Sequence, residues 1–215
     1  MTRTATPKQP RRTQEQRSSE MRVRLLDATI ECLVEYGYAG TTTPRVAELA
    51  GVTRGAQVHH FGSKTDLVVA AVSHLAQRRT EAAMKEISRM RAGDDPLGTA
   101  LEGLWELHQG PLFIAAIELW VAARTDPALA VEVEKVEPYV NNAVLLAVAQ
   151  LVPNEMHRKN VRDFAYTAMD TLRGILVTNF VSPDPDRGHR RWLRASAQLR
   201  LAAAAVMPDL DADGL

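Results

Sequence analysis

The sequence predicts an all-α protein, and three observations support this prediction. Apolar residues recur at helical spacing along most of the 215 residues. Several of the eleven prolines directly follow a residue that can cap a helix. No segment alternates apolar and polar residues as a half-buried strand does, and no Asn-Gly or Asp-Gly pair separates two apolar segments. We therefore expect about nine helices and no sheet.

The elements follow from these signals in order. Thr43, Asp95 and Asp126 each precede a proline, which predicts a capped helix start. Gly37 predicts the end of the first helix, and Pro138 predicts a kink in the seventh. The expected helices are 19–36, 44–50, 54–60, 64–91, 96–108, 111–124, 127–151, 154–180 and 187–206.

Composition excludes several classes of protein. Cys32 is the only cysteine, which excludes an internal disulfide and a zinc site built from cysteines. No run of apolar residues is long enough for a transmembrane helix, and the polar, basic beginning of the chain is unlike a signal peptide. The sequence predicts a cytoplasmic protein with no metal and no cofactor.

The net charge of zero conceals an asymmetry. Residues 1–65 carry ten lysines and arginines against six acidic residues, whereas the rest carries 16 basic and 20 acidic residues. A basic end on an acidic body suits a protein that approaches a polyanion with one face, although a difference this small also arises by chance.

The strongest local signal is a helix-turn-helix. The expected helix 44–50 ends at Gly51, which can adopt the left-handed conformation of a turn. Thr53 then caps the second short helix, 54–60. Such a capped second helix can enter the major groove of DNA.

From Arg24 to Leu67 the sequence resembles the DNA-binding domain of the tetracycline-repressor (TetR) family. The residues that carry the resemblance are Leu26-Asp27-Ala28, Gly37, Thr41-Thr42-Thr43, Val46-Ala47, Ala50-Gly51-Val52-Thr53, Gly55, His59-His60-Phe61 and Ser63-Lys64-Thr65-Asp66-Leu67. The resemblance implies a three-helix DNA-binding domain over 19–66 and a helical ligand-binding and dimerisation domain over 67–207. Residues 1–18 would form a disordered basic arm and 208–215 a flexible tail. Val58 replaces the tyrosine usual in this family.

The short helix and its surroundings supply the candidate DNA contacts. Outward-facing Arg45 and Arg54 can pair with guanine, and an outward Gln57 can pair with adenine. Small side chains at Gly55 and Ala56 let the backbone approach the groove. Phosphate contacts are expected from Thr42, Thr43, Thr53, His59, His60 and Lys64. The alternatives are a solvated or metal-binding histidine pair, an ordinary surface lysine and, for the arm, a merely solubilising end.

The helical body predicts a cavity for a small lipophilic molecule. Polar and aromatic groups are scattered over its apolar segments, and the resemblance implies a ligand among them. The candidate ligand contacts are Trp105, His108, Phe113, Ile117, Trp120, Met169 and Arg173. The alternative is ordinary core packing.

The last two long helices predict a homodimer. The stripes Val161, Ala165, Ala168, Leu172, Ile175, Asn179 and Trp192, Ala195, Leu199, Ala202, Val206 have heptad-like spacing. The resemblance implies dimers through 154–180 and 187–206, and the alternative is packing within one chain.

Together these features predict a transcriptional repressor that binds a palindromic double-stranded DNA operator and is released by a small molecule. Two other classes stay open: a DNA-binding protein that senses nothing, and an enzyme using the body cavity. The sequence contains no evident nucleophile with its base, metal cluster or phosphate loop, so we do not expect an enzyme.

Overall fold

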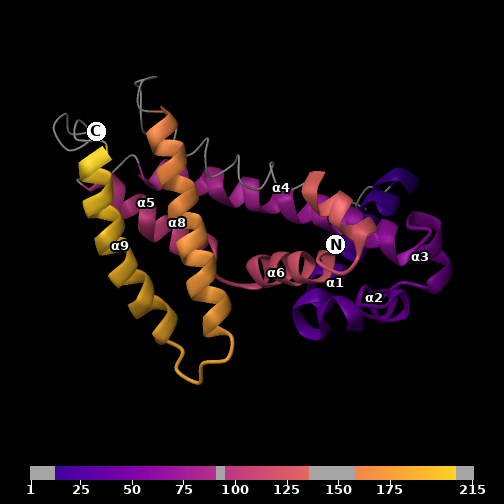
Figure 1. Ribbon diagram of the computed structural model, residues 1–215. Helices are drawn as coiled ribbons and strands as arrows, with labels where there is room; N and C mark the ends of the chain where they lie inside the picture. Colours follow the sequence, from indigo (N-terminus) through magenta and orange to yellow (C-terminus); the bar gives the residue numbers. More distant parts are fainter. Residues whose placement is uncertain (1–12, 91–94, 136–157, 207–215) are drawn as a thin grey trace, which may run out of the picture. The chain divides into compact units, whose positions relative to one another are not determined.

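The computed structural model describes residues 13–90, 95–135 and 158–206. These residues contain helices and no strand, which confirms the predicted fold class. The helices shown in Figure 1 are α1 (Gln14–Gly40), α2 (Thr43–Leu49), α3 (Arg54–His60), α4 (Lys64–Met90), α5 (Pro96–Leu107), α6 (Pro111–Ala123), α8 (Arg158–Asn179) and α9 (Arg187–Val206). Residues 127–135 are also helical.

Helix α1 begins earlier than the sequence predicted. The Thr13 hydroxyl accepts a hydrogen bond from the Gln16 backbone, and the Gln16 side chain accepts one from the Thr13 backbone. This reciprocal cap starts the helix at Gln14, so the last residues of the expected disordered arm are helical instead. Gly37, with φ of 65°, interrupts α1 at the predicted stop. The rest of the arm, the Pro138 kink and the 208–215 tail lie outside the described residues.

The chain divides into two compact units, Met1–Ala71 and Val72–Leu215. The division falls inside α4, a helix of 27 residues, rather than in a loop. The start of α4 therefore belongs to the first unit, where Leu67 and Val68 are fully buried. No described helix is both long and apolar enough to cross a membrane.

The first unit is built around one apolar face each of α1 and α2. Leu25 and Leu33 of α1 and Val46 of α2 are all at most 1% exposed. Burial of three such side chains contributes roughly 1.5–3 kcal/mol each. This burial gives the short helices a fixed support.

In the second unit, α5, α6, α8 and α9 contribute side chains to one large cluster, and Val161 of α8 and Ala203 of α9 form a smaller one. Figure 1 shows α8 and α9 side by side, with α5 against them. The buried members of the cluster include Leu101, Phe113, Met169, Leu172, Trp192 and Leu199. An ion pair of 2.7 Å between Arg200 of α9 and Asp95, which caps α5, also joins these two helices and lowers the pKa of Asp95.

This packing corrects the predicted dimer stripes. Val161, Ala165, Ala168, Leu172 and Ile175 are at most 7% exposed within one chain. Trp192 and Leu199 are likewise buried in the chain's own core. The heptad-like spacing reflects packing within the chain, the alternative that the sequence left open, because an intrachain seam and a dimer seam have the same period.

Candidate nucleic-acid interface

Helices α2 and α3 form the predicted helix-turn-helix. Gly51 has φ of 63°, a conformation that costs glycine little, and the Val52 backbone donates to the Ala47 carbonyl at 3.0 Å. The Thr53 hydroxyl accepts from the Ala56 backbone at 3.2 Å and so caps α3. The bounds of α3 are the predicted 54–60.

The threonine hydroxyls are already engaged as caps. The cap of α2 is Thr42, one residue before the predicted Thr43, and its hydroxyl accepts from the Arg45 backbone. Thr53 has the same role at α3. A capping hydroxyl still has its own proton to donate, so Thr42 and Thr53 can cap a helix and bind a phosphate oxygen together. Thr43 lies half-buried in the first turn of α2.

Gln57 points into the protein, which corrects its expected outward orientation. Its side chain is 1% exposed, and its Nε2 donates to the Phe61 carbonyl at 3.1 Å. The Phe61 backbone N–H in turn donates to the Gln57 carbonyl at 2.8 Å. Gln57 therefore closes the end of α3 and is not placed to read a base. Its spacing of four residues from the apolar Phe61 was the sequence signal that both share one face.

The outer face of α3 is formed by other residues. Arg54, Gly55, Val58 and His59 are exposed, whereas Ala56 is half-buried. Arg54 lies at the start of the helix, as expected of a guanine-reading side chain. Val58 is 51% exposed and was not among the predicted contacts.

Arg45 and Lys64 are both attached to the end of α1. The Arg45 guanidinium donates to the Gly40 carbonyl and lies 4.1 Å from the centre of the Tyr36 ring. The Lys64 Nζ donates to the Tyr38 carbonyl at 2.8 Å and lies 4.2 Å from the centre of the Tyr38 ring. These contacts give both cations a structural role that the sequence did not predict. Arg45 is exposed and Lys64 is half-buried.

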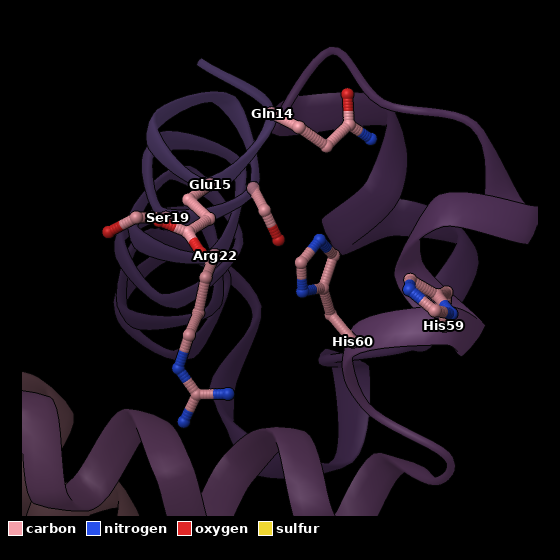
Figure 2. A pocket seen from close by; sticks show the side chains of 7 residues that line it. Gln14, Glu15, Ser19, Arg22, His59 and His60 are labelled. Atoms are coloured by element: carbon pink, nitrogen blue, oxygen red, sulfur yellow. The ribbon is translucent and has the colours of Figure 1, made fainter.

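A polar hollow of about 490 Å³ lies between α1 and the end of α3. Figure 2 shows His60 pointing toward the α1 side of this hollow, with His59 beside it. Burial lowers the pKa of His60, and the charges of His59 and Arg22 lower it further, which favours the neutral ring. The residues that line the hollow are Gln14, Glu15, Ser18, Ser19, Arg22, His59 and His60. Its hydroxyl, imidazole and guanidinium groups can donate hydrogen bonds to a phosphate.

The second unit brings the seven predicted ligand contacts together. Phe113, Ile117 and Met169 lie in its buried cluster, with Trp105 and Trp120 packed against it. The His108 ring lies 5.5 Å from the Phe113 ring, and its Nδ1 contacts the Leu104 carbonyl. Arg173 lies over Trp120, with 5.0 Å between the guanidinium carbon and the ring centre. Whether they bind a ligand stays a prediction, because the same contacts also build the core.

Four further residues, which the sequence did not assign to the ligand site, lie at or beside this cluster. The His189 ring lies 4.8 Å from the Trp105 ring. Gly188 is packed so tightly that a Cβ would lie 3.1 Å from Asn179 Nδ2. Asn179 Oδ1 and Trp192 Nε1 are buried without a hydrogen-bond partner in the part of the chain that the structure describes. Such atoms are costly to bury, so they are suited to meeting a polar group of a ligand.

Comparisons with known proteins connect both units to one family. The family model described as "Bacterial regulatory proteins, tetR family" matches residues 25–71. The chain is 31% identical over 183 residues to the transcriptional regulator CymR of Pseudomonas putida, an alignment that covers 84% of this chain and 89% of CymR. It is 33% identical over 102 residues to the transcriptional repressor AcnR of Corynebacterium glutamicum, covering 44% and 54% of the two chains.

A comparison of folds finds a protein described as a member of the same family. The crystal structure of a protein described as a TetR-family transcriptional regulator from Mesorhizobium loti superposes with a TM-score of 0.69. Its sequence identity is 16%, and the match covers 88% of this chain and 98% of that one. The likeness therefore extends over both units.

The buried position of Gln57 generates a prediction about stability. We expect Gln57→Ala to lower the free energy of unfolding by roughly 2–3 kcal/mol, because it leaves a cavity and an unsatisfied Phe61 carbonyl. Urea-induced unfolding followed by circular dichroism measures this change. Gln57→Leu fills the same space but also leaves the Phe61 carbonyl unpaired, so it should lower the free energy of unfolding by less than Gln57→Ala does and still by about 1 kcal/mol or more. If Gln57→Ala left the stability unchanged and altered the base preference, the buried orientation would be wrong and the predicted outward orientation of Gln57 would be right.

Proposed function

Because this chain belongs to the tetR family of bacterial transcriptional regulators, we propose that it is a repressor that releases its operator when a small lipophilic molecule binds the second unit. Binding DNA and regulating transcription is what the family does. The repressor AcnR is among the relatives, which supports repression as the direction of regulation. We propose that its role is binding rather than catalysis.

The observation that carries this proposal is the outer face of α3. The helix is capped at Thr53 and fixed from within by Gln57, so its exposed side is presented as a rigid surface. Arg54 at its first turn can donate two hydrogen bonds to guanine O6 and N7. We assign Arg54 as a base reader and place α3 in the major groove, where a helix fits. The small Gly55 and Ala56 allow the close approach.

Phosphate binding is assigned to the surroundings of α3. The hydroxyls of Thr42 and Thr53 can donate while they cap their helices. His59 and His60 open onto the polar hollow, and Arg22, Ser18 and Ser19 add donors from α1. Thr43 and Lys64 stay proposed phosphate contacts, and Lys64 also holds the end of α1. Arg45 stays a proposed guanine contact, and its guanidinium also holds the end of α1. These contacts would fix the register of α3 on the duplex without reading sequence.

Selection from a random duplex library tests the assignment of Arg54. The wild-type chain should select a palindromic sequence, because a two-fold dimer presents two copies of α3. We expect Arg54→Ala to reduce discrimination at one position of each half-site by ~1–3 kcal/mol. Arg124→Ala, which removes an exposed arginine at the end of α6, should select the same sequence as the wild type. An unchanged preference in Arg54→Ala would remove Arg54 from the base readers.

The ligand is proposed to bind at the cluster around Trp105, Phe113 and Met169. Aromatic and aliphatic side chains dominate this cluster, which suits a lipophilic molecule. His108, Ile117, Trp120 and Arg173 are its other proposed contacts. The buried Trp192 Nε1 and Asn179 Oδ1 favour a ligand that also carries one hydrogen-bonding group.

Ligand and operator should weaken one another's binding. If the ligand favours a state that binds DNA poorly by ~2–3 kcal/mol, operator affinity falls about 30- to 150-fold. All three tryptophans lie in the second unit, so their fluorescence can follow the binding of small aromatic compounds from a panel. Titration of the compound that binds, with and without the selected operator, should give affinities that differ by that same factor. Equal affinities would favour the alternative of a DNA-binding protein that senses nothing.

A dimer is proposed through the outer faces of α8 and α9. Leu193 and Leu201 of α9 are 51% and 67% exposed, and Tyr166 and Val177 of α8 are 37% and 40% exposed. Tyr166 and Val177 are separated by about three helical turns and so share one face. These four side chains are exposed, whereas Ala202 is the one exposed residue among the described side chains of the predicted stripes. The proposed interface lies within the expected 154–180 and 187–206, of which 154–157 lie outside the described residues.

A charge on this outer face should separate the dimer. We expect Leu201→Glu to raise the dimer dissociation constant at least about 100-fold, since each of two symmetry-related leucines loses ~1.5–3 kcal/mol of burial. Analytical ultracentrifugation measures the change, with Val121→Glu as the matched control, because Val121 is an apolar residue of α6 that is 60% exposed and lies outside the proposed interface. Leu199→Glu should instead unfold the second unit, because Leu199 is 8% exposed within one chain. A wild-type monomer would contradict the proposed interface.

A further inference from the structure

We propose that Val58 reads a thymine by contacting its C5-methyl group in the major groove. This inference rests on the proposed function, in which α3 enters that groove. It adds an apolar contact to the polar ones already assigned, and it names one base that the operator must contain.

The orientation of α3 places Val58 on the outside. Gln57 and Phe61 are 1% and 3% exposed and so define the inward face. Successive residues of a helix are about 100° apart, which turns Val58 away from that face. Residues three and four apart are neighbours on a helix surface, so Val58 lies beside Gly55 and Arg54. Both of these neighbours are exposed.

The exposure of Val58 distinguishes it within its unit. At 51% it is the most exposed large apolar side chain among the described residues of Met1–Ala71, ahead of Tyr36 and Leu49 at 43%. Tyr36 is covered by the Arg45 guanidinium, and Leu49 lies on α2. Val58 alone of the three occupies the proposed reading helix.

The chemistry of the groove supplies one matching group. Base pairs present hydrogen-bond donors and acceptors there, and their apolar feature is the thymine methyl group. The side chain of Val58 offers no hydrogen bond, so it can discriminate only through this methyl group. A β-branched side chain is also stiff at χ1, so little conformational freedom is lost when it makes contact. The neighbouring Gly55 has no side chain, so it leaves room for the edge of the base beside Val58.

The test removes the methyl group from the DNA and the valine from the protein. A consensus duplex is first selected with the full-length wild-type chain from a random library. Each thymine is then replaced by deoxyuridine, which keeps the base pair and lacks only the methyl group. We expect one replacement in one half-site to weaken wild-type binding about fourfold, the effect of one buried methyl-sized group, and the matching replacement in both half-sites to weaken it about 15-fold.

Variants of Val58 complete the cycle. Val58→Ala should bind the thymine and deoxyuridine duplexes equally at that position, whereas Val58→Ile, which retains the branched side chain, should keep the difference. Because Val58 is exposed, both variants should have the same urea midpoint of unfolding as the wild type. A variant that has lost its fold would show a lower midpoint and would be recognised in this way. The inference would be overturned if no deoxyuridine replacement weakened wild-type binding. It would also be overturned if the replacement weakened binding of the wild type and of Val58→Ala equally. A wild type that selects no sequence at all would overturn the proposed function itself.

Discussion

The reciprocal hydrogen bonding between Gln57 and Phe61 is the constraint on which the proposed DNA-binding surface depends. A helix of seven residues is far too short to be stable by itself in water, where about 12–15 residues are marginal. Helix α3 therefore depends on hydrogen bonds at its two ends. The Thr53 hydroxyl accepts from the first turn, and the two bonds between Gln57 and Phe61 close the last turn. Since Gln57 is buried, these bonds form away from water and also fix which side of the helix faces outward.

The sequence predicted the parts of the interface that follow from local rules. Thr53 as a cap, Gly51 as a left-handed turn and the bounds of α3 depend on backbone chemistry within a few residues, and all three are confirmed. The direction of Gln57 was missed because a polar side chain on a short helix was taken to face water. The partner of Lys64 is the Tyr38 carbonyl, 26 residues earlier in the chain, and local sequence rules contain no information about so distant an acceptor. The Gly40 carbonyl that accepts from Arg45 is only five residues away, but it belongs to the preceding helix, so helical spacing does not predict this contact.

The second unit shows a different limit of sequence reasoning. Apolar spacing in α8 and α9 correctly indicated buried helix faces. Trp105, Phe113 and Met169 were grouped as candidate ligand contacts from the resemblance. They pack in one cluster, and their contact with a ligand stays a prediction. It could not tell whether Leu199 packs against its own chain or a second one, because the same periodicity serves both. The burial of Leu199 within one chain, where it is 8% exposed, answered the question, and burial depends on the tertiary packing of every neighbouring helix.

The continuity of α4 has a consequence for any attempt to separate the two units. They are joined within one helix of 27 residues rather than by a loop. Each backbone N–H inside such a helix bonds to the carbonyl four residues earlier, so a cut there leaves N–H groups and carbonyls without partners on both new ends. Neither unit can therefore be excised at the boundary without creating a helix terminus that the intact chain does not have.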